Sequence, residues 1–229
     1  MTRDDYLIFE NYMLSCMEDS AHDKEHIYRV MYMALEIAQT EKNVDYDVLI
    51  CACLLHDVGR KEQFEDPKLC HAQAGADKAY HFLKENGFSE EFAKRVSKCI
   101  RTHRFRAETQ PESIEAKILF DADKIDVTGA VGIARTLVYK GQVGEPLYSV
   151  TEDGSVADGT MKGEGPSFFQ EYKYKLENIY TKFYTARGAE IAKSRQEAAA
   201  VFYENMLREV REPYEKGKKY LERVVENNE

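Results

Sequence analysis

Residues 48–57 read Val48-Leu49-Ile50-Cys51-Ala52-Cys53-Leu54-Leu55-His56-Asp57. The apolar residues of this stretch predict a buried helix, and the stretch ends on a histidine and a carboxylate. Burying these two polar groups is costly unless something pairs with them. Neutral imidazole and carboxylate are also common protein ligands of divalent metal ions. The stretch therefore predicts a helix that carries two candidate metal ligands into the core.

The composition predicts one globular protein. A chain of 229 residues, 43% hydrophobic and 32% charged, can bury one full core. No apolar run approaches the roughly 18 residues that a membrane span needs. The first residues, Met1-Thr2-Arg3-Asp4-Asp5, lack the basic region and apolar stretch of a signal peptide. We therefore expect a cytoplasmic protein that makes no membrane contact.

The charge limits the class of partner. A formal net charge of −9 disfavours extended contact with nucleic acid, whose phosphate backbone selects basic surfaces. A small phosphorylated ligand remains compatible with this charge, because it requires only a local cluster of cations. On the general frequency of symmetric assemblies, the expected oligomer is a homodimer.

Helical periodicity runs through most of the chain. Apolar residues recur at helical spacing over the ranges 4–20, 24–40, 47–57, 72–86, 90–103 and 112–139, the last as one long or slightly broken helix. Asp45 is the expected N-cap or first-turn acid of the third helix, and Gly59 ends that helix. Helical pattern returns from residue 167 and includes a helix over about 188–211, which we expect Pro213 to separate from a charged terminal piece.

The stretch between the two helical regions differs in composition. Six of the 13 glycines lie between Gly141 and Pro166, so helix is improbable there. Within it, residues 147–151 form a candidate strand or hairpin arm. We therefore predict an all-α fold in three parts: a helical core over 1–139, a glycine-rich insert over 140–166 with a candidate β-hairpin, and a C-terminal helical extension over 167–229 that packs on the core.

Further candidate ligands stand outside the apolar stretch. His26 lies in the predicted helix 24–40, and the acidic phrase Asp121-Ala122-Asp123-Lys124-Ile125-Asp126 lies within 112–139. With His56 and Asp57 they give two histidines and two carboxylates from three separate helices. Such a set leaves coordination positions of a divalent ion open for water and phosphate.

Three phrases stand in order along the chain. They are His22-Asp23-x-x-His26-Ile27-x-Arg29-Val30, Leu54-Leu55-His56-Asp57-Val58-Gly59 and the acidic phrase 121–126, and with the residues that follow they span about 22–135. This order resembles the HD-domain superfamily of metal-dependent phosphohydrolases. The resemblance implies an all-α HD-domain helical bundle in which one divalent metal ion (Mn, Fe, Co, Ni or Mg) activates water for attack on a phosphoester or phosphoanhydride. The ligands that it implies are His26, His56, Asp57 and Asp123.

The choice of Asp123 rests on its context, because a basic and then an apolar residue follow it, as in the family. Asp121 and Asp126 stay open as groups that orient the ligands. In two-metal relatives, positions like His71 and His103 hold the second ion, and in one-metal relatives they meet the substrate's phosphates. We expect phosphate contact here.

Other polar residues near the phrases are candidates for substrate contact. His22 shares a helix face with His26 and could orient a ligand, contact phosphate or simply lie at the surface. Cations also lie beside the predicted ligands, and solvated charges on helix ends are the alternative explanation for them. The strongest of these cations are Arg29, Lys61 and Lys124.

The resemblance also implies a catalytic scheme. Asp57 holds the metal ion, Lys61 and Arg29 spread the charge that develops on phosphate, and Asp126 or Asp121 accepts the proton of the attacking water. The acidic phrase, followed by Gly129-Ala130-Val131-Gly132-Ile133-Ala134-Arg135, is similar to small bacterial HD hydrolases. Some of these cut nucleoside triphosphates to monophosphate and pyrophosphate.

We therefore predict release of pyrophosphate from a nucleoside triphosphate. Two alternative substrates are a nucleoside monophosphate and a guanosine tetraphosphate alarmone. Two alternatives belong to other classes of protein. One is a non-catalytic HD-like nucleotide-binding module, and the other is a helical oligomerisation protein whose histidines are ordinary core groups.

Overall fold

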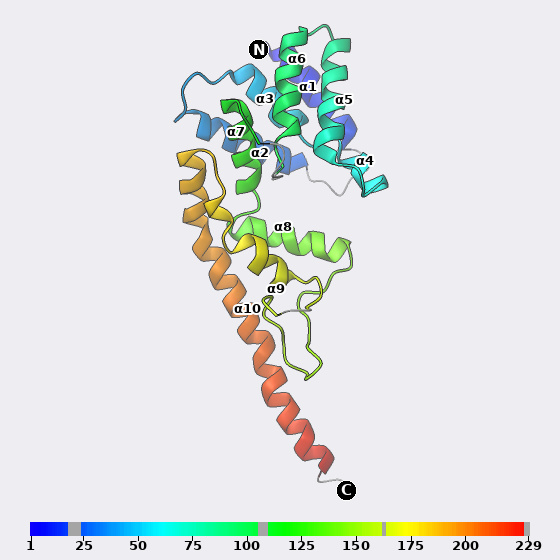
Figure 1. The fold of residues 1–229 in the computed structure, drawn as a ribbon, viewed down its shortest axis with the longest axis vertical. Helices are drawn as coiled ribbons and strands as arrows, with labels where there is room; N and C mark the ends of the chain where they lie inside the picture. Colours follow the sequence, from blue (N-terminus) through cyan, green and yellow to red (C-terminus); the bar gives the residue numbers. More distant parts are fainter. Residues whose placement is uncertain (18–23, 105–109, 162–163, 227–229) are drawn as a thin grey trace. The chain divides into compact units, whose positions relative to one another are not determined.

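The computed structural model describes residues 1–17, 24–104, 110–161 and 164–226 (Figure 1). The elements in chain order are α1 (Arg3–Cys16), α2 (Lys24–Ala38), α3 (Tyr46–Leu55), α4 (Arg60–Glu65), α5 (His71–Glu85), α6 (Glu90–Arg101), α7 (Ile114–Ile125), α8 (Gly129–Gln142), α9 (Phe168–Glu171), a π turn (Tyr172–Leu176), a 3-10 turn (Ile179–Thr181) and α10 (Ala186–Glu226). Over these described ranges the chain forms helices and no strand, so the predicted all-α class is confirmed.

The chain divides into two compact units. The first contains Met1–Asp126 and Phe183–Ala189, and the second contains Val127–Lys182 and Glu190–Glu229. The helix predicted over 112–139 is broken where the units meet in sequence, between α7 and α8. Gly129 begins α8 with a φ of 62°, a backbone conformation that favours glycine.

Helix α3 is the central element of the first unit and packs against α1, α2, α6 and α7. Its core side chains are fully buried because the helix is apolar on nearly all sides. Asp45 caps its first turn, as predicted, and accepts hydrogen bonds from the backbone N–H groups of Asp47 and Val48. His56 is the C-cap, so the buried helix delivers the His56-Asp57 pair to the inside of the unit.

A close backbone contact fixes the segment that follows the pair. A Cβ atom on Gly59 would lie 2.4 Å from the backbone nitrogen of Gly75 and 2.4 Å from the carbonyl oxygen of His71. Only glycine allows this approach, and it holds the start of α4 against the first turn of α5. The contact therefore places His71 next to the His56-Asp57 pair.

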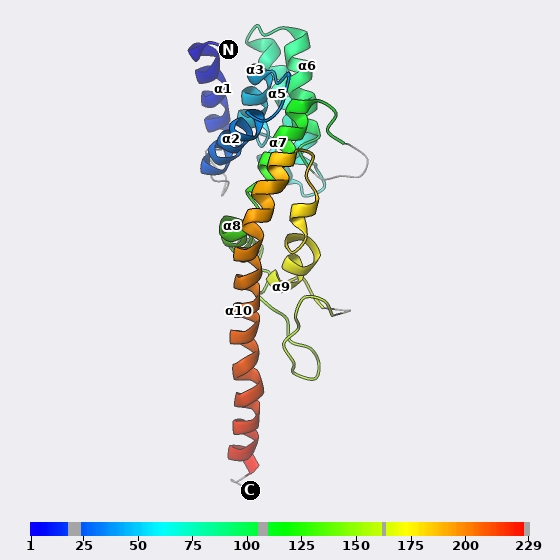
Figure 2. The same cartoon turned by 90° about the vertical axis from the view of Figure 1, so that its left-hand side faces the viewer.

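The second unit has its own apolar core. Phe168 and Phe169 of α9 and Tyr203 of α10 are among its buried members. The rings of Phe168 and Phe202 meet edge to face at 6.0 Å, so α9 lies alongside α10 (Figure 2). The insert has one isolated antiparallel bridge between Val150 and Val156. A β-hairpin is not formed in its described part.

Helix α10 corrects one prediction. It runs from Ala186 to Glu226 through Pro213, which we expected to end it. Proline removes one backbone hydrogen bond from a helix, but Pro213 is exposed, so water can solvate the carbonyl group that loses its partner. The residues on either side are mostly strong helix formers and continue the helix.

Candidate metal centre

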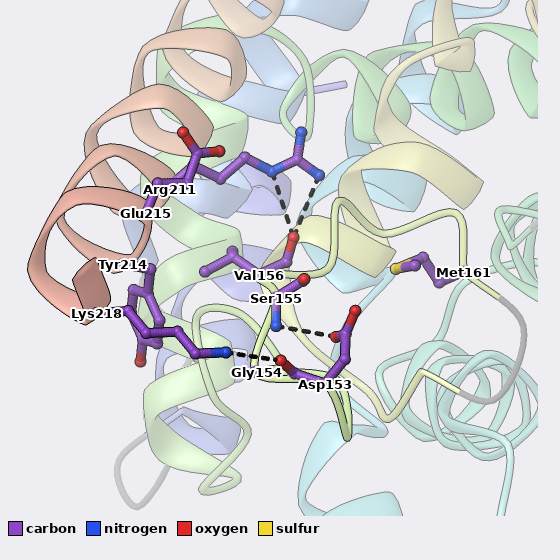
Figure 3. Close-up of a pocket in the computed structure, with 9 residues that line it drawn as sticks. All are labelled: Asp153, Gly154, Ser155, Val156, Met161, Arg211, Tyr214, Glu215 and Lys218. Atoms are coloured by element: carbon purple, nitrogen blue, oxygen red, sulfur yellow. Dashed lines mark hydrogen bonds between the residues drawn. The ribbon is translucent and has the colours of Figure 1, made fainter. Parts of the chain in front are cut away.

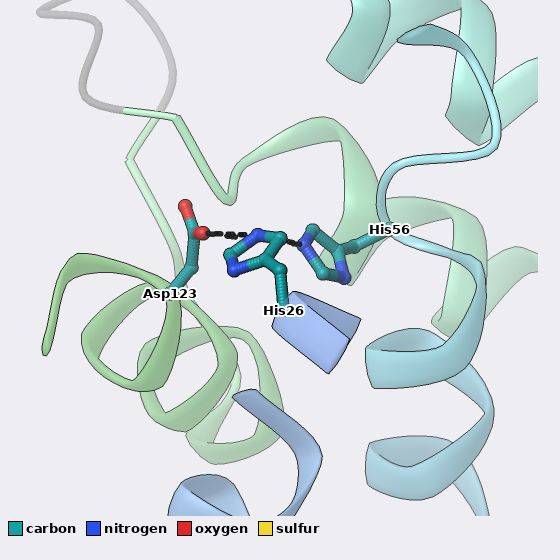
Figure 4. Close-up of side chains that lie close together, drawn as sticks. All are labelled: His26, His56 and Asp123. Atoms are coloured by element: carbon teal, nitrogen blue, oxygen red, sulfur yellow. Dashed lines mark hydrogen bonds and ion pairs between the residues drawn. The ribbon is translucent and has the colours of Figure 1, made fainter. Parts of the chain in front are cut away.

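Three of the predicted ligands meet between α2, α3 and α7 (Figure 4). His26 lies in the first turn of α2, His56 caps α3, and Asp123 lies in the last turn of α7. Nε2 of His26 is 3.4 Å from Nε2 of His56 and 3.3 Å from Oδ1 of Asp123, and Nε2 of His56 is 3.9 Å from that oxygen. Ligand atoms bound to one ion at about 2.1 Å are separated by similar distances.

Asp57, the fourth predicted ligand, lies beside this group. Its Oδ2 is 3.6 Å from Nε2 of His26 and 3.7 Å from Nε2 of His56. The structure therefore brings all four predicted ligands together.

The other oxygen of Asp57 faces a second group. Oδ1 is 3.5 Å from Nε2 of His71 and 3.7 Å from Nε2 of His103. These two nitrogens lie 3.2 Å apart. Asp57, His71 and His103 thus form a second set of atoms that could hold a metal ion, and the carboxylate of Asp57 lies between the two sets.

All four imidazoles are oriented in the same way. Nδ1 of His56 lies 2.7 Å from the carbonyl oxygen of Cys53, and Nδ1 of His103 lies 2.6 Å from that of Ile100. Because a carbonyl oxygen only accepts, Nδ1 carries the proton in both rings. Nδ1 of His71 meets Oε1 of Gln63 at 2.5 Å and is its donor in the same way.

His26 completes this pattern. Its Nδ1 lies 2.7 Å from Oδ2 of Asp126, a carboxylate oxygen that accepts the hydrogen bond. Every ring therefore turns Nε2, the nitrogen left for a metal ion, toward the two clusters. A proton on Nδ1 held by a carbonyl or carboxylate oxygen is typical of metal-binding histidines.

The chemistry of these atoms fits a cation. Asp57 is 1% exposed, and both its carboxylate oxygens lack a hydrogen-bond partner of good geometry. Nε of Arg60 lies 2.9 Å from Oδ1 as an ion pair, but the angles are not those of a hydrogen bond. A buried carboxylate without hydrogen bonds is costly. A divalent ion would supply the missing interaction.

The pKa shifts agree with this view. Burial lowers the pKa of His26, but its interactions with the nearby carboxylates of Asp123, Asp126 and Asp57 outweigh burial and raise it to about 10. The metal-free site thus keeps a proton among three carboxylates, and a metal ion would displace that proton. Burial lowers the pKa of His103 to about 4, so its ring is neutral near neutral pH.

Asp126 contacts His26, one of the predicted ligands, and is not itself a member of either cluster. Besides His26, it binds Arg29, whose Nε and second guanidinium nitrogen lie 2.8 Å and 3.1 Å from its two oxygens. Asp126 is 4% exposed. This arrangement orients both His26 and Arg29, whereas the predicted role of Asp126 as a proton acceptor stays a prediction.

Asp121 lies outside both clusters. Its carboxylate accepts hydrogen bonds from the backbone N–H groups of Tyr184 and Thr185, at 2.9 Å and 2.7 Å, and from the hydroxyl of Thr185. Burial raises the pKa of Asp121. The residue thereby fastens the segment 183–189 to α7 within the first unit.

The remaining candidates for phosphate contact do not belong to either cluster. Lys61 is exposed on α4, and Nζ of Lys124 lies 4.2 Å from the centre of the Phe120 ring. His22 falls outside the described residues. Gln63 was not predicted, and no residue pattern singles it out. The backbone carbonyl groups that accept from His56 and His103 were not predicted either, because no side-chain pattern marks them.

Comparison with known proteins agrees with the geometry. The HD domain family model matches residues 24–128. A predicted HD superfamily hydrolase from an uncultured Thermotogales bacterium is 30% identical, with 90% of this chain and 91% of that chain covered and a TM-score of 0.56. The chain belongs to the HD-domain superfamily of hydrolases.

In two further comparisons this HD hydrolase is similar to the same bacterial protein. YpgQ of Bacillus subtilis is 29% identical over 198 residues, which cover 84% of this chain and 86% of YpgQ. The crystal structure of YpgQ in complex with ADP is 28% identical, covers 89% of this chain and 96% of that chain, and has a TM-score of 0.66. None of the helices in the described parts of this HD hydrolase has the length and apolar character needed to cross a bilayer.

Proposed function

We propose that this HD hydrolase is a metal-dependent phosphohydrolase that acts on a nucleotide. The specific reaction that we propose is hydrolysis of a nucleoside triphosphate to the monophosphate and pyrophosphate. The observation that carries the proposal is the common orientation of the four imidazoles, each with its Nε2 turned toward Asp57 or Asp123. Support for a nucleotide comes from YpgQ, whose structure contains ADP.

The proposed ligands of the metal ion are His26, His56, Asp57 and Asp123. An ion of the Mn, Fe, Co, Ni or Mg type would supply Lewis acidity, which activates water and neutralises phosphate charge. Asp123 is the most accessible of these ligands, with 23% of its side chain exposed, so substrate would approach from its side.

The residues around the ligands have distinct proposed roles. Asp126 holds His26 in the orientation that presents Nε2, and it holds Arg29 beside the site. The side chain of Arg29 is 37% exposed, so part of its guanidinium group faces solvent and could meet phosphate. Lys61 and Lys124 are proposed as further phosphate contacts, because each follows a ligand closely in sequence.

The second cluster favours a second cation over direct phosphate contact. Nε2 of His71 and Nε2 of His103 are acceptors, since Nδ1 carries the proton in each ring. An acceptor nitrogen cannot donate a hydrogen bond to phosphate, whereas it can bind a metal ion. We therefore keep a second divalent ion at Asp57, His71 and His103 as an alternative to the one-metal site.

The alternative of an oligomerisation protein with ordinary core histidines is not favoured by this geometry. A core histidine normally has a hydrogen-bond partner on each ring nitrogen that needs one. In the second cluster, Nε2 of His71 and Nε2 of His103 are acceptors that face one another and the carboxylate of Asp57, an arrangement that is repulsive without a cation.

The experiment is product analysis on purified protein without a histidine tag. A panel of nucleoside triphosphates, monophosphates and a guanosine tetraphosphate is incubated with Mn²⁺, Co²⁺ or Mg²⁺, and pyrophosphate and orthophosphate are measured separately. We expect metal-dependent pyrophosphate release from a triphosphate. Orthophosphate alone would assign one of the alternative substrates. Tight nucleotide binding without turnover of any compound would instead assign a binding module.

A further inference from the structure

Positively charged side chains approach oxygen atoms of two kinds in this HD hydrolase. In the second unit, a cavity of about 340 Å³ lies between the glycine-rich insert and α10 (Figure 3). Beside it, Arg211 donates to the carbonyl oxygen of Val156 at 3.2 Å and 3.3 Å. Nζ of Lys218 donates to the carbonyl oxygen of Asp153 at 3.2 Å. These acceptors are neutral, so the two cations fasten the insert to α10. In the first unit, Arg60 faces a buried carboxylate instead.

The fold fixes Arg60 three residues after Asp57. The backbone N–H of Arg60 donates to the carbonyl oxygen of Asp57 at 3.0 Å, and the close contact of Gly59 with α5 holds the same turn. Nε of Arg60 lies 2.9 Å from Oδ1 of Asp57. The ring nitrogens of the second cluster lie farther from that oxygen, at 3.5 Å for His71 and 3.7 Å for His103. Arg60 therefore brings a permanent positive charge to the second cluster.

The two oxygens of Asp57 thus face different groups. Oδ2 lies 3.6 Å from Nε2 of His26 and 3.7 Å from Nε2 of His56, where the proposed metal ion would bind. Oδ1 faces Arg60. In a two-metal site the ions lie about 3.5–4 Å apart and share their ligands. Here one of the two positions beside the carboxylate already has a cation that belongs to the chain.

Charge balance separates one metal ion from two. Metal-binding histidines are neutral, so the negative charge of the two clusters comes from Asp57 and Asp123. Asp126 adds none, because its carboxylate pairs with Arg29. One divalent ion balances the two carboxylates, whereas a second divalent ion would add two positive charges close to Arg60. Like charges repel strongly in a buried site, where the local dielectric constant is low.

We propose that Arg60 takes the place of a second metal ion and limits this HD hydrolase to one divalent ion per chain. Its charge offsets the acceptor nitrogens of His71 and His103 and the carboxylate that faces them. Since Arg60 acts at the proposed metal centre, the proposal rests on the proposed function. It favours the one-metal form of that centre over the two-metal form. Arg60 acts through Asp57 and is a positioning residue.

The test counts bound ions by native mass spectrometry and by calorimetric titration with Mn²⁺. Protein stripped with a chelator is measured in buffer free of phosphate and nucleotide, because a bound anion would add negative charge to the site. We expect one ion for the wild type. We expect two for Arg60→Met, which removes the charge and keeps a long side chain. The affinity for the second ion should rise at least about tenfold in this variant.

Three further variants separate the charge of Arg60 from other effects. Arg60→Lys keeps the charge and should hold one ion. Arg101→Met removes an arginine that pairs with Asp77 at 2.6 Å in an exposed position, and it should also hold one. Arg60→Met combined with His71→Ala loses a nitrogen of the second cluster and should return from two ions to one.

The count of ions can contradict the proposal in several ways. Two ions in the wild type, one ion in folded Arg60→Met, or two ions in Arg60→Lys would each overturn it. If circular dichroism shows that Arg60→Met does not fold, Arg60→Gln takes its place with the same expected count. A wild type that binds no ion would contradict the metal centre and the proposed function together. A wrong count beside metal-dependent hydrolysis would overturn only the role of Arg60.

Discussion

Asp126 accepts a hydrogen bond from Nδ1 of His26 at 2.7 Å, and this bond turns Nε2 of His26 toward the other candidate ligands. The two residues are 100 positions apart in the chain. Their contact joins the first turn of α2 to the end of α7, so the fold and the orientation of a ligand depend on the same interaction.

Replacing Asp126 should therefore weaken metal binding without removing a ligand. Groups that orient a metal-binding histidine typically contribute about 10- to 100-fold to affinity. We expect Asp126→Asn to lower the affinity for Mn²⁺ by about this factor, measured by competition with a chelating dye. Asp77→Asn, which breaks the exposed 2.6 Å pair with Arg101, is the control and should bind Mn²⁺ normally. Wild-type affinity in Asp126→Asn would contradict the orienting role.

The two histidine clusters should respond differently to truncation. His56 belongs to the group with His26 and Asp123, whereas His71 belongs to the second group. We expect His56→Ala to lose the bound ion and His71→Ala to retain one, as measured by elemental analysis after purification without a tag. If the wild type holds two ions per chain, His71→Ala should hold one. Equal loss of all metal in both variants would contradict two separate positions.

The contact between Gly59 and α5 predicts a large loss of stability. A Cβ atom in Gly59→Ala would meet the backbone of Gly75 and His71 at 2.4 Å, and backbone atoms cannot move aside cheaply. We expect the free energy of unfolding in urea to fall by about 2–4 kcal/mol. Gly141→Ala in α8, where a Cβ atom meets nothing within 4 Å, should leave stability unchanged or raise it by up to about 1 kcal/mol. Similar stability of the two variants would show that the approach is not close.

The cap of α3 predicts a dependence on pH. Burial raises the pKa of Asp45, but the hydrogen bond from the Val48 N–H group and the ion pair with Arg95 outweigh burial and lower it. Because the folded pKa lies below the ordinary value of 3.8, ionised Asp45 stabilises the fold above that value, and this contribution is lost as pH falls through the folded pKa.

Asp45→Asn keeps a capping oxygen and removes only the charge. Near neutral pH we expect it to be less stable than the wild type by about 0.5 kcal/mol, since the pair with Arg95 is partly exposed. The difference between the two free energies of unfolding should shrink as pH falls below 3.8, because the carboxyl group is protonated first in the unfolded chain and then, at its lower folded pKa, in the fold. A difference that grows on acidification would contradict the assigned direction.

Features that depend only on a residue and its neighbours along the chain were predictable from the sequence. The apolar run ending in His56 and Asp57 predicted a buried helix, and Asp45 predicted its cap, because both signals are local. The meeting of His26 with Asp123 followed from the resemblance to the HD-domain superfamily. Spacing along the chain does not show it, since residues so far apart meet only through tertiary packing.

Other features could not be predicted from such local patterns. The carbonyl groups of Cys53 and Ile100 that orient two rings are backbone atoms, which every residue has. The position of Asp57 between two clusters depends on the direction of its side chain. Pro213 was expected to end a helix, but its exposed position lets the helix continue, and burial is a property of the fold.

The buried carboxylate of Asp57 is proposed to serve both metal binding and catalysis. The most direct test measures the metal content and the nucleotide hydrolysis of the same samples of wild-type and Asp57→Ala protein, with circular dichroism to check folding. We predict that folded Asp57→Ala loses both the bound ion and turnover, while the wild type has both and loses turnover when a chelator removes the ion. A folded Asp57→Ala protein that hydrolyses nucleotides at the wild-type rate without bound metal would rule out this role of Asp57.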